Sequence, residues 1–305
     1  MKGTMDSLNL ACKLWGVSPD EICKVLTSKG MGKAVGNVRV AYKLVQAQDA
    51  RAAMVKKVYG ELFELMVSSI NKELMGSGEN RQNFIGVLDI FGFESFEVNS
   101  FEQLCINFCN EKLQFHFNEH IFKMELDLYA LENIHIPASA FVDNQPTLDL
   151  LEVPAKGVFS MIDEEINVPR GSDEGLLNKI FQAYNTGKTG DVNNHPNLLK
   201  PKSKDCVNHM NNFGILHYAG PVFYNVANFL EKNKDSLHED IGGVLREANI
   251  NLVSDMFPIP PPAAPAGGRR GSTMGGKKKT LGGQFKAQLN ELIATLNSTY
   301  PHFVR

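Results

Sequence analysis

Three residues that could take part in phosphate chemistry stand at short intervals in one apolar stretch, FIGVLDIFGFE, residues 84–94. Asp89 ends an apolar run, and a carboxylate at the end of a buried strand is where nucleotide-binding proteins hold a water of the Mg²⁺ shell. Gly92 lacks a Cβ, so a backbone N–H there can approach a phosphate closely. Glu94 adds a second carboxylate. On spacing alone, a buried strand ending in a solvated acid explains the same residues equally well.

The apolar pattern predicts the elements that would position this stretch. Phe84 to Leu88 is a short apolar run and predicts a buried strand. Ser100 and Gln103 form a Ser-x-x-Gln capping box, which predicts the start of a helix. Apolar residues then recur on most sides up to about Leu128, which predicts a helix of roughly 40 Å, buried among partners. The candidate site would therefore be joined directly to a long rod.

Periodicity and turn residues predict the remaining elements. The predictions are a helical region at 5–27, with Pro19 at a first helical position; a loop or hairpin at 29–43; a helix at 49–74; a turn at 75–83; helices at 147–183, broken at 168–172; a hairpin at 213–225; a helix at 285–296; and a terminal strand at 302–305.

The composition changes between Pro258 and Gly283, where proline and glycine dominate. This segment carries five cations and no acid, which predicts a flexible basic linker. It could act as a solvated tether, as an arm for nucleic acid or as a contact for an acidic protein. The five cations are Arg269, Arg270, Lys277, Lys278 and Lys279.

Length and composition limit the class of protein. A chain of 305 residues suggests about two domains, and 43% hydrophobic with 21% charged residues is typical of a globular protein. A net charge of −3 provides no overall basic field, so we expect no nucleic-acid partner. The sequence contains no apolar run of 18 residues, so we predict no membrane span. Five cysteines without paired metal-ligand spacing favour a reducing, cytoplasmic setting.

Several blocks of sequence together resemble one family. DIFGFE at 89–94, followed by NSFEQLCINFCNEKLQ at 99–114, resembles switch II and the relay helix of a myosin motor domain. HYAGPVFYN at 217–225 with FLEKNKD at 229–235 resembles a second myosin block, and YPHFVR at 300–305 resembles the strand before the family's reactive-thiol helices. The resemblance runs from near residue 8 to the last residue.

The resemblance implies an α/β fold that is mostly helical. The chain would be part of a P-loop NTPase-type myosin motor, with a few core-sheet strands and helical actin-binding subdomains. The implied divisions are the end of the upper actin-cleft subdomain at 1–83; the switch II strand, relay helix and relay loop at 84–145; the lower actin-binding subdomain at 146–256; the flexible basic surface loop at 257–284; and a helix with a terminal core strand at 285–305.

The resemblance also implies a role for each residue of the candidate site. Asp89 would hold a water of the Mg²⁺ shell, and the Gly92 N–H would bind the γ-phosphate of ATP. Ile90 and Phe91 would complete the contact with the nucleotide. Glu94 would pair with an arginine from a second switch. Loss of the γ-phosphate would then remove contacts from this segment and move the relay helix.

No segment supplies the phosphate-binding loop that such an enzyme needs. At 187–189 the chain reads Gly-Lys-Thr, but the G-x-x-x-x-G-K-[ST] pattern requires a glycine where Gln182 stands. At 32–33 it reads Gly-Lys, but Ala34 follows and lacks the hydroxyl for Mg²⁺. The first switch is also missing from these residues. We therefore expect the chain alone neither to hydrolyse ATP nor to bind ATP and Mg²⁺ tightly.

The resemblance places contacts with actin filaments on two helical segments and on the basic linker, whose cations would meet acidic residues of actin. A buried helix pair is almost as good an explanation for any single residue in the two helical segments. The candidates there are Ile162, Val168, Pro169, Arg170, Leu289, Leu292 and Leu296.

Two positions depart from the family pattern. Ile136 stands where the relay loop usually carries a tryptophan, and residues 36–39 lack the acidic or phosphorylatable residue that many myosins carry there.

We therefore expect a fragment of a cytoskeletal motor whose partners are actin filaments and the rest of the motor domain. A non-catalytic actin-binding module derived from a myosin is the alternative. A third hypothesis rests on His116, Glu119 and His120, which fit the H-x-x-E-H pattern of zinc proteases. Ordinary helix residues explain this pattern better, because no third ligand follows. Cys105 and Cys109 are expected to be small core residues.

Overall fold

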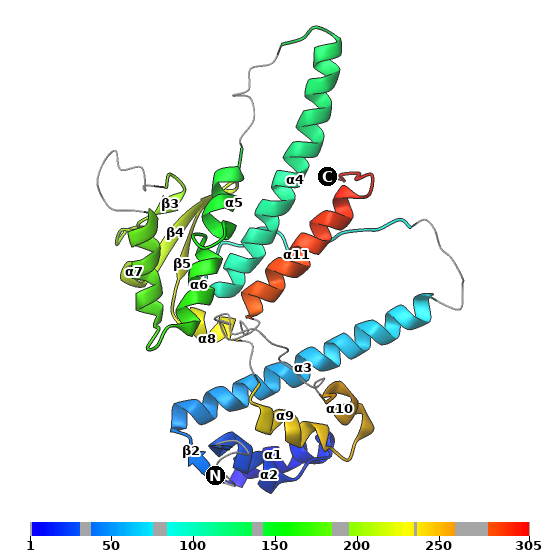
Figure 1. Ribbon diagram of the computed structural model, residues 1–305, viewed down its shortest axis with the longest axis vertical. Helices are drawn as coiled ribbons and strands as arrows, with labels where there is room; N and C mark the ends of the chain where they lie inside the picture. Colours follow the sequence, from blue (N-terminus) through cyan, green and yellow to red (C-terminus); the bar gives the residue numbers. More distant parts are fainter. Residues whose placement is uncertain are drawn as a thin grey trace, which may run out of the picture. The chain divides into compact units, whose positions relative to one another are not determined.

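The computed structural model describes residues 2–30, 38–75, 84–135, 143–184, 195–234, 237–259 and 280–304 (Figure 1). The chain divides into two compact units. The N-terminal unit comprises Met1–Gly86 and Ser236–Gly275, and the central unit comprises Val87–Asp235 and Gly276–Arg305. Each unit thus combines segments that are far apart in the sequence.

The N-terminal unit is mostly helical, and its helices pack around one apolar cluster. Helix α2 begins as predicted, with Ser18 in an extended conformation and Pro19 in the first turn. A two-stranded antiparallel hairpin follows it and pairs Lys29 with Val40. The elements are α1 Lys2–Trp15, α2 Pro19–Thr27, β1 Ser28–Gly30, β2 Arg39–Ala41, α3 Leu44–Met75, α9 Glu239–Arg246 and α10 Asn251–Met256. Buried members of the cluster include Cys12, Ile22, Val25, Met54, Val58, Ile241, Leu245, Val253, Met256 and Phe257.

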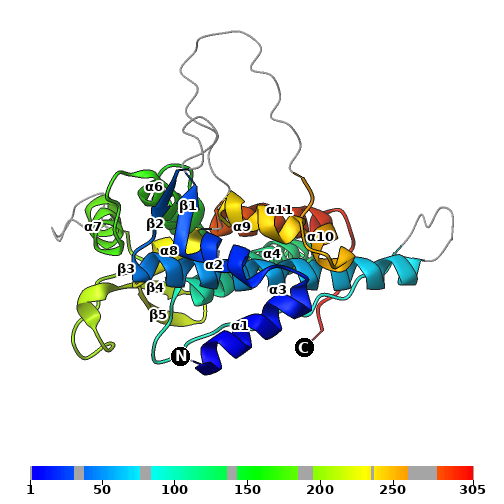
Figure 2. The ribbon, with the colours of Figure 1, turned by 90° about the horizontal axis from the view of Figure 1, so that it is seen from below.

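The central unit packs helices against a three-stranded antiparallel sheet with the order β3-β4-β5. The predicted hairpin is present and turns at Gly220, whose φ of 128° favours glycine. Helix α11 lies beside α4 in Figures 1 and 2. The elements are α4 Phe101–Leu131, α5 Gln145–Glu152, α6 Val158–Asn167, α7 Asp173–Tyr184, β3 Leu198–Leu199, a 3₁₀ turn His209–Asn211, β4 Asn212–His217, β5 Gly220–Asn225, α8 Phe229–Asn233 and α11 Leu281–Asn297.

Helix α4 begins where the capping box predicted. Ser100 is the N-cap, and its own N–H donates to Gln103 Oε1 at 3.0 Å. The first turns of α4 are buried in the core of the central unit, where Phe101, Leu104 and Phe108 are at most 1% exposed. The prediction that the helix is buried up to about Leu128 is wrong, because α4 extends past this core and Leu128 is 53% exposed.

The predicted strand at Phe84–Leu88 is wrong. Residues 84–96 form no strand, and Ile85 and Val87 are 99% and 93% exposed. A strand is held by hydrogen bonds to a neighbouring strand, and the described part of the chain places none beside this run. The predicted terminal strand is also not formed over residues 302–304. Instead, the Phe303 ring packs edge-on against the Phe117 ring, with 4.8 Å between the ring centroids.

The other helix predictions are confirmed, with shifted ends. The helix predicted at 49–74 is α3, and the break at 168–172 separates α6 from α7. A further break at 153–157 was not predicted, although Pro154 and Gly157 signalled it.

The predicted flexible linker at 258–283 ends too late, because its last residues belong to α11. Thr280 caps α11 by accepting a hydrogen bond from the Gly283 N–H at 3.1 Å, so residues 281–283 are helical. Residues 260–279 lie outside the described residues.

Candidate functional site

The residues of the candidate site lie in a segment without regular secondary structure, directly before α4. Asp89 and Gly92 are exposed, and Glu94 is half-buried. Two asparagines of α4 hold the main chain of this segment: Asn110 Nδ2 donates to the Phe91 carbonyl at 3.0 Å, and Asn107 binds both main-chain groups of Glu94. The segment is therefore fixed to the helix through its backbone, which leaves the side chain of Asp89 exposed to solvent.

The carboxylate of Glu94 is turned toward the start of α4. Its Oε2 atom accepts from Gln103 Nε2 at 3.2 Å. Because Gln103 also caps the helix through Ser100, its amide links Glu94 to the N-terminus of α4.

Gly92 has open space around it. A Cβ built on this residue would meet no heavy atom within 4 Å. Packing against the described residues thus does not require a glycine here, which agrees with a role in close approach to a ligand.

A buried network of polar groups lies beneath Glu94. Asn107 Nδ2 donates to Tyr224 Oη at 2.9 Å. His217 lies between Tyr224 and Glu111, with its Nε2 atom 2.7 Å from Tyr224 Oη and its Nδ1 atom 2.9 Å from Glu111 Oε1. Burial raises the pKa of the Tyr224 hydroxyl well above its usual value. Sequence reasoning did not single out these residues, although polar residues inside an apolar helix pattern, such as Asn107 and Glu111, were a signal.

The candidate partner-contact residues on α6 and the turn after it are not all accessible. Ile162 is fully buried, so its prediction as a contact residue is corrected: its side chain belongs to the core. Val168, Pro169 and Arg170 are exposed in the turn between α6 and α7. Below this turn, the buried Glu165 pairs with Lys179 at 2.7 Å.

The candidates on α11 face inward to different degrees. Leu289 is 4% exposed and is likewise corrected to a core residue, because it belongs to the buried apolar cluster of the central unit. Leu292 and Leu296 are partly buried.

Several predictions concern residues outside those described. They are the basic residues Arg269, Arg270, Lys277, Lys278 and Lys279; the segments 32–34 and 187–189; Ile136; and the first part of the loop at 36–39.

The two histidines of the H-x-x-E-H pattern stack on each other along α4. The His116 and His120 ring centroids are 6.2 Å apart, and the Phe303 ring packs against both. Burial and the neighbouring His120 lower the pKa of His116. Across the described residues, no cluster of three or more His, Cys, Asp or Glu could hold a metal ion, so the zinc hypothesis gains no third ligand there.

The expectation for the two cysteines of α4 holds for one of them. Cys105 is buried in the core, and burial raises the pKa of its thiol to about 12. Cys109 is only partly buried at the edge of the same core, where burial again raises the pKa of the thiol.

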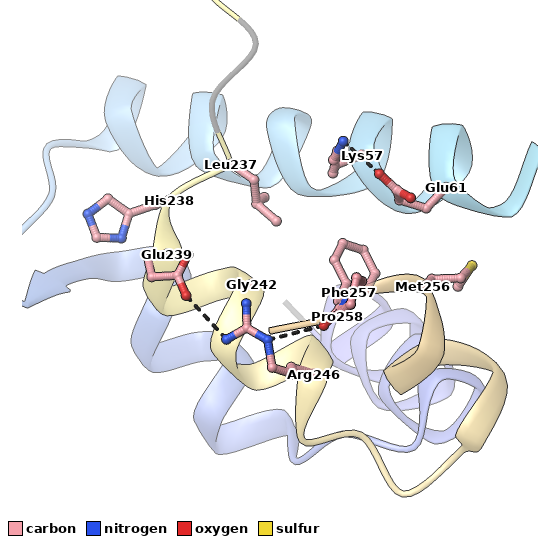
Figure 3. Close-up of a pocket in the computed structure, with 10 residues that line it drawn as sticks. All are labelled: Lys57, Glu61, Leu237, His238, Glu239, Gly242, Arg246, Met256, Phe257 and Pro258. Carbon is pink, nitrogen blue, oxygen red and sulfur yellow. Dashed lines mark hydrogen bonds and ion pairs between the residues drawn. The ribbon is translucent and has the colours of Figure 1, made fainter. Parts of the chain in front are cut away.

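A shallow hollow of about 270 Å³ lies in the N-terminal unit, between α3 and residues 237–258 (Figure 3). Its cations are already paired: Lys57 binds Glu61 at 2.6 Å, and Arg246 binds Glu239 at 3.2 Å and donates to the Phe257 carbonyl. Because carboxylates neutralise both of these cations, the hollow is poorly suited to bind an anionic ligand.

Among the described helices, none is both long and apolar enough to cross a membrane.

A long helix begins at a capping box and binds the preceding glycine-containing segment through two asparagines. Comparison with known proteins identifies the family of this chain. The family model of the myosin head (motor domain) matches residues 1–305. The chain belongs to the myosin head (motor domain) family.

Individual relatives agree with this assignment. The chain is 38% identical to the myosin-I heavy chain of Dictyostelium discoideum over 301 residues, which cover 98% of this chain and 12% of that protein. It is 37% identical to human unconventional myosin-Vc over 310 residues, covering 98% of this chain and 17% of that protein. It is 38% identical to myosin-2B of Naumovozyma castellii over 313 residues, covering 100% of this chain and 21% of that protein. The chain thus spans between 12% and 21% of the length of these three relatives.

Proposed function

We propose that this chain forms the part of an actin-based motor that links the γ-phosphate of MgATP to a long helix and to an actin-binding surface. The observation that carries the proposal is the attachment of α4 to the segment before it, through Asn110 at Phe91 and Asn107 at Glu94. Because these bonds join backbone to helix, a displacement of the segment is transmitted to α4.

The residues of the segment take the roles that the family resemblance implies. Asp89 holds a water of the Mg²⁺ shell, the Gly92 N–H binds the γ-phosphate, and Ile90 and Phe91 complete the nucleotide contact. Glu94 pairs with an arginine outside this chain and exchanges its contact with Gln103 for that pair. In the intact P-loop NTPase-type motor, the run 84–88 becomes a strand of the core sheet once neighbouring strands are supplied.

The catalytic role is tested by a chimera. In it, this chain replaces the matched 301 residues of the Dictyostelium myosin-I heavy chain. We expect actin-stimulated phosphate release by the chimera and none by these 305 residues alone. Glu94→Gln in the chimera should lower the rate of phosphate release at least about tenfold, because a charge-assisted contact is removed. An inactive chimera that is folded and binds filaments would overturn the motor proposal.

The second candidate function is a non-catalytic actin-binding module of the cytoplasmic cytoskeleton. It is favoured by the lack of any G-x-x-x-x-G-K-[ST] match in these 305 residues. The inactive, filament-binding chimera just described is the result that this candidate predicts.

Actin contacts are proposed at the exposed turn Val168–Arg170 and, independently of it, at the basic residues 269–270 and 277–279. We predict that the full chain sediments with actin filaments and that Val168→Glu with Arg170→Glu weakens binding about tenfold, because apolar contact is lost and like charges oppose. The matched control is Val207→Glu with Lys204→Glu, the same change in net charge at exposed positions elsewhere in the central unit. Equal weakening by both pairs would contradict the location of the surface.

A further inference from the structure

We propose that Glu111, His217, Tyr224 and Asn107 form a directional chain of hydrogen bonds that sets the position of the main chain at Glu94. Asn107 and Tyr224 are then positioning residues. The inference rests on the proposed function, in which Glu94 belongs to the segment that responds to the nucleotide.

The direction of the chain follows from the donors of Asn107. Its Oδ1 atom accepts from the Glu94 N–H at 2.8 Å, so its Nδ2 atom supplies two hydrogens. One goes to the Glu94 carbonyl at 2.7 Å and the other to Tyr224 Oη at 2.9 Å. Tyr224 thus accepts from Asn107, which leaves its own O–H to donate to His217 Nε2 at 2.7 Å.

His217 must then carry its proton on the other ring nitrogen. With Nε2 acting as acceptor, Nδ1–H donates to Glu111 Oε1 at 2.9 Å. With a proton on Nε2, Tyr224 would accept from both Asn107 and His217, and neither of these groups could then accept its own O–H. The geometry therefore selects the neutral Nδ1–H form of His217.

Glu111 anchors the chain at its far end. Its Oε1 atom also accepts from the Tyr218 N–H at 2.8 Å, and Oε2 accepts from Asn144 Nδ2 at 2.6 Å. The side chains of Glu111 and His217 are 0% exposed. A buried carboxylate is tolerated only with several donors of this kind, so Glu111 holds the imidazole in one orientation.

The order carboxylate, imidazole, hydroxyl matches that of a hydrolytic triad, but the surroundings argue for positioning. Tyr224 is 0% exposed, and its hydroxyl is already bonded to Asn107 and His217. No substrate can reach it without opening the core. The network instead ties Glu94, α4 and the β4-β5 hairpin together, so a shift of the main chain at Glu94 either carries α4 with it or breaks the bonds to Asn107.

The first test uses the unaltered full chain. The ¹⁵N chemical shifts of the His217 ring, assigned by comparison with His217→Gln, report which nitrogen is protonated. We expect the Nδ1–H form near neutral pH. The Nε2–H form or the imidazolium would overturn the inference, because the chain of donors could not run from Asn107 through Tyr224 and His217 to Glu111.

The second test measures amide hydrogen exchange at Glu94. Tyr224→Phe removes one hydroxyl, and we expect exchange at Glu94 to become about fivefold to tenfold faster, as for the loss of one hydrogen bond. Tyr184→Phe is the matched control, because its hydroxyl donates to the Lys156 carbonyl at 2.6 Å in the same unit. Exchange at Glu94 that is equal in the two variants would overturn the inference. If Tyr224→Phe does not fold, the ring nitrogen shifts decide alone.

Neither measurement requires nucleotide or actin. An inactive chimera with the expected His217 form and exchange behaviour therefore refutes the proposed function and leaves the network intact. An active chimera with the wrong His217 form refutes the network alone.

Discussion

At the scale of single residues, the candidate site is defined by what its main chain contacts. Asn107 and Asn110 bind backbone groups of the segment before α4, so the side chain of Asp89 is left available for a ligand. The types of the site residues could be predicted from the sequence, because the glycine and carboxylates stand close together. The network under Glu94 could not be predicted, since Asn107 and Tyr224 are 117 residues apart and meet only through the fold.

Gly92→Ala separates function from packing at this site. Because a Cβ there meets no atom within 4 Å, we expect the free energy of unfolding of the chain to change by less than about 0.5 kcal/mol. The same change in the chimera should lower phosphate release at least about tenfold if the N–H must approach a phosphate.

Urea denaturation of the chain measures the stability change. Gly157→Ala is the control, since its Cβ would lie 2.7 Å from the Leu151 carbonyl oxygen and should destabilise the central unit. A Gly92→Ala chain that is as destabilised as Gly157→Ala would contradict the open environment of Gly92.

At the scale of elements, local sequence signals predicted the helices and hairpins well and the apolar run 84–88 badly. The start of α4 was predictable because Ser100 and Gln103 act within one turn. The run 84–88 was not, because strand formation depends on a neighbour that local sequence does not name. Burial was likewise overestimated at Leu128, where apolar residues continue beyond the core that covers the first turns of α4.

The hairpin β1-β2 is attached to the start of α9 by one carboxylate. Asp240 Oδ2 accepts from the Gly30 N–H at 2.9 Å and pairs with Arg39 at 2.9 Å. Burial alone raises the pKa of Asp240, but the Gly30 N–H, His238 and Arg39 together lower the pKa below its ordinary value of 3.8. The ionised form is therefore favoured by folding.

We predict that Asp240→Asn lowers the stability of the N-terminal unit by about 1 kcal/mol near neutral pH, since this charge is about a quarter exposed. A lowered folded-state pKa contributes stability fully above 3.8 and loses that contribution as the pH falls through the lower folded-state value. The unaltered chain and the variant should therefore converge in acid.

Fluorescence of Trp15, the only tryptophan, follows unfolding of this unit. Asp255→Asn, at an exposed position on α10, is the control and should change stability little at any pH. A pH-independent difference between Asp240→Asn and the unaltered chain would refute the role of the charge.

At the scale of the whole molecule, the chain presents an apolar segment without a covering element among the described residues. Phe84 is 70% and Phe91 is 75% exposed, with Ile85 and Val87 almost fully exposed between them. An exposed apolar segment outside any strand offers its side chains to another chain.

We predict that the isolated chain self-associates with increasing concentration and that Ile85→Lys with Val87→Lys reduces this association at least about tenfold, because charges oppose pairing of extended segments. Sedimentation velocity over a concentration series measures the effect. Leu131→Lys is the control, since this exposed leucine lies at the end of α4. Association that Leu131→Lys reduces as much as the double variant would show that the segment is not its cause.

The interleaving of the two units has a consequence for the order in which the protein can fold during synthesis. The cluster formed by Cys12, Ile22 and Met54 also requires Ile241 and Phe257, which leave the ribosome only after the whole sequence of β3, β4 and β5. The central core in turn awaits Leu289 near the end of the chain. Neither unit can bury its core while the chain is half made, so the nascent polypeptide must remain soluble for most of its synthesis, which is the situation in which chaperones are needed.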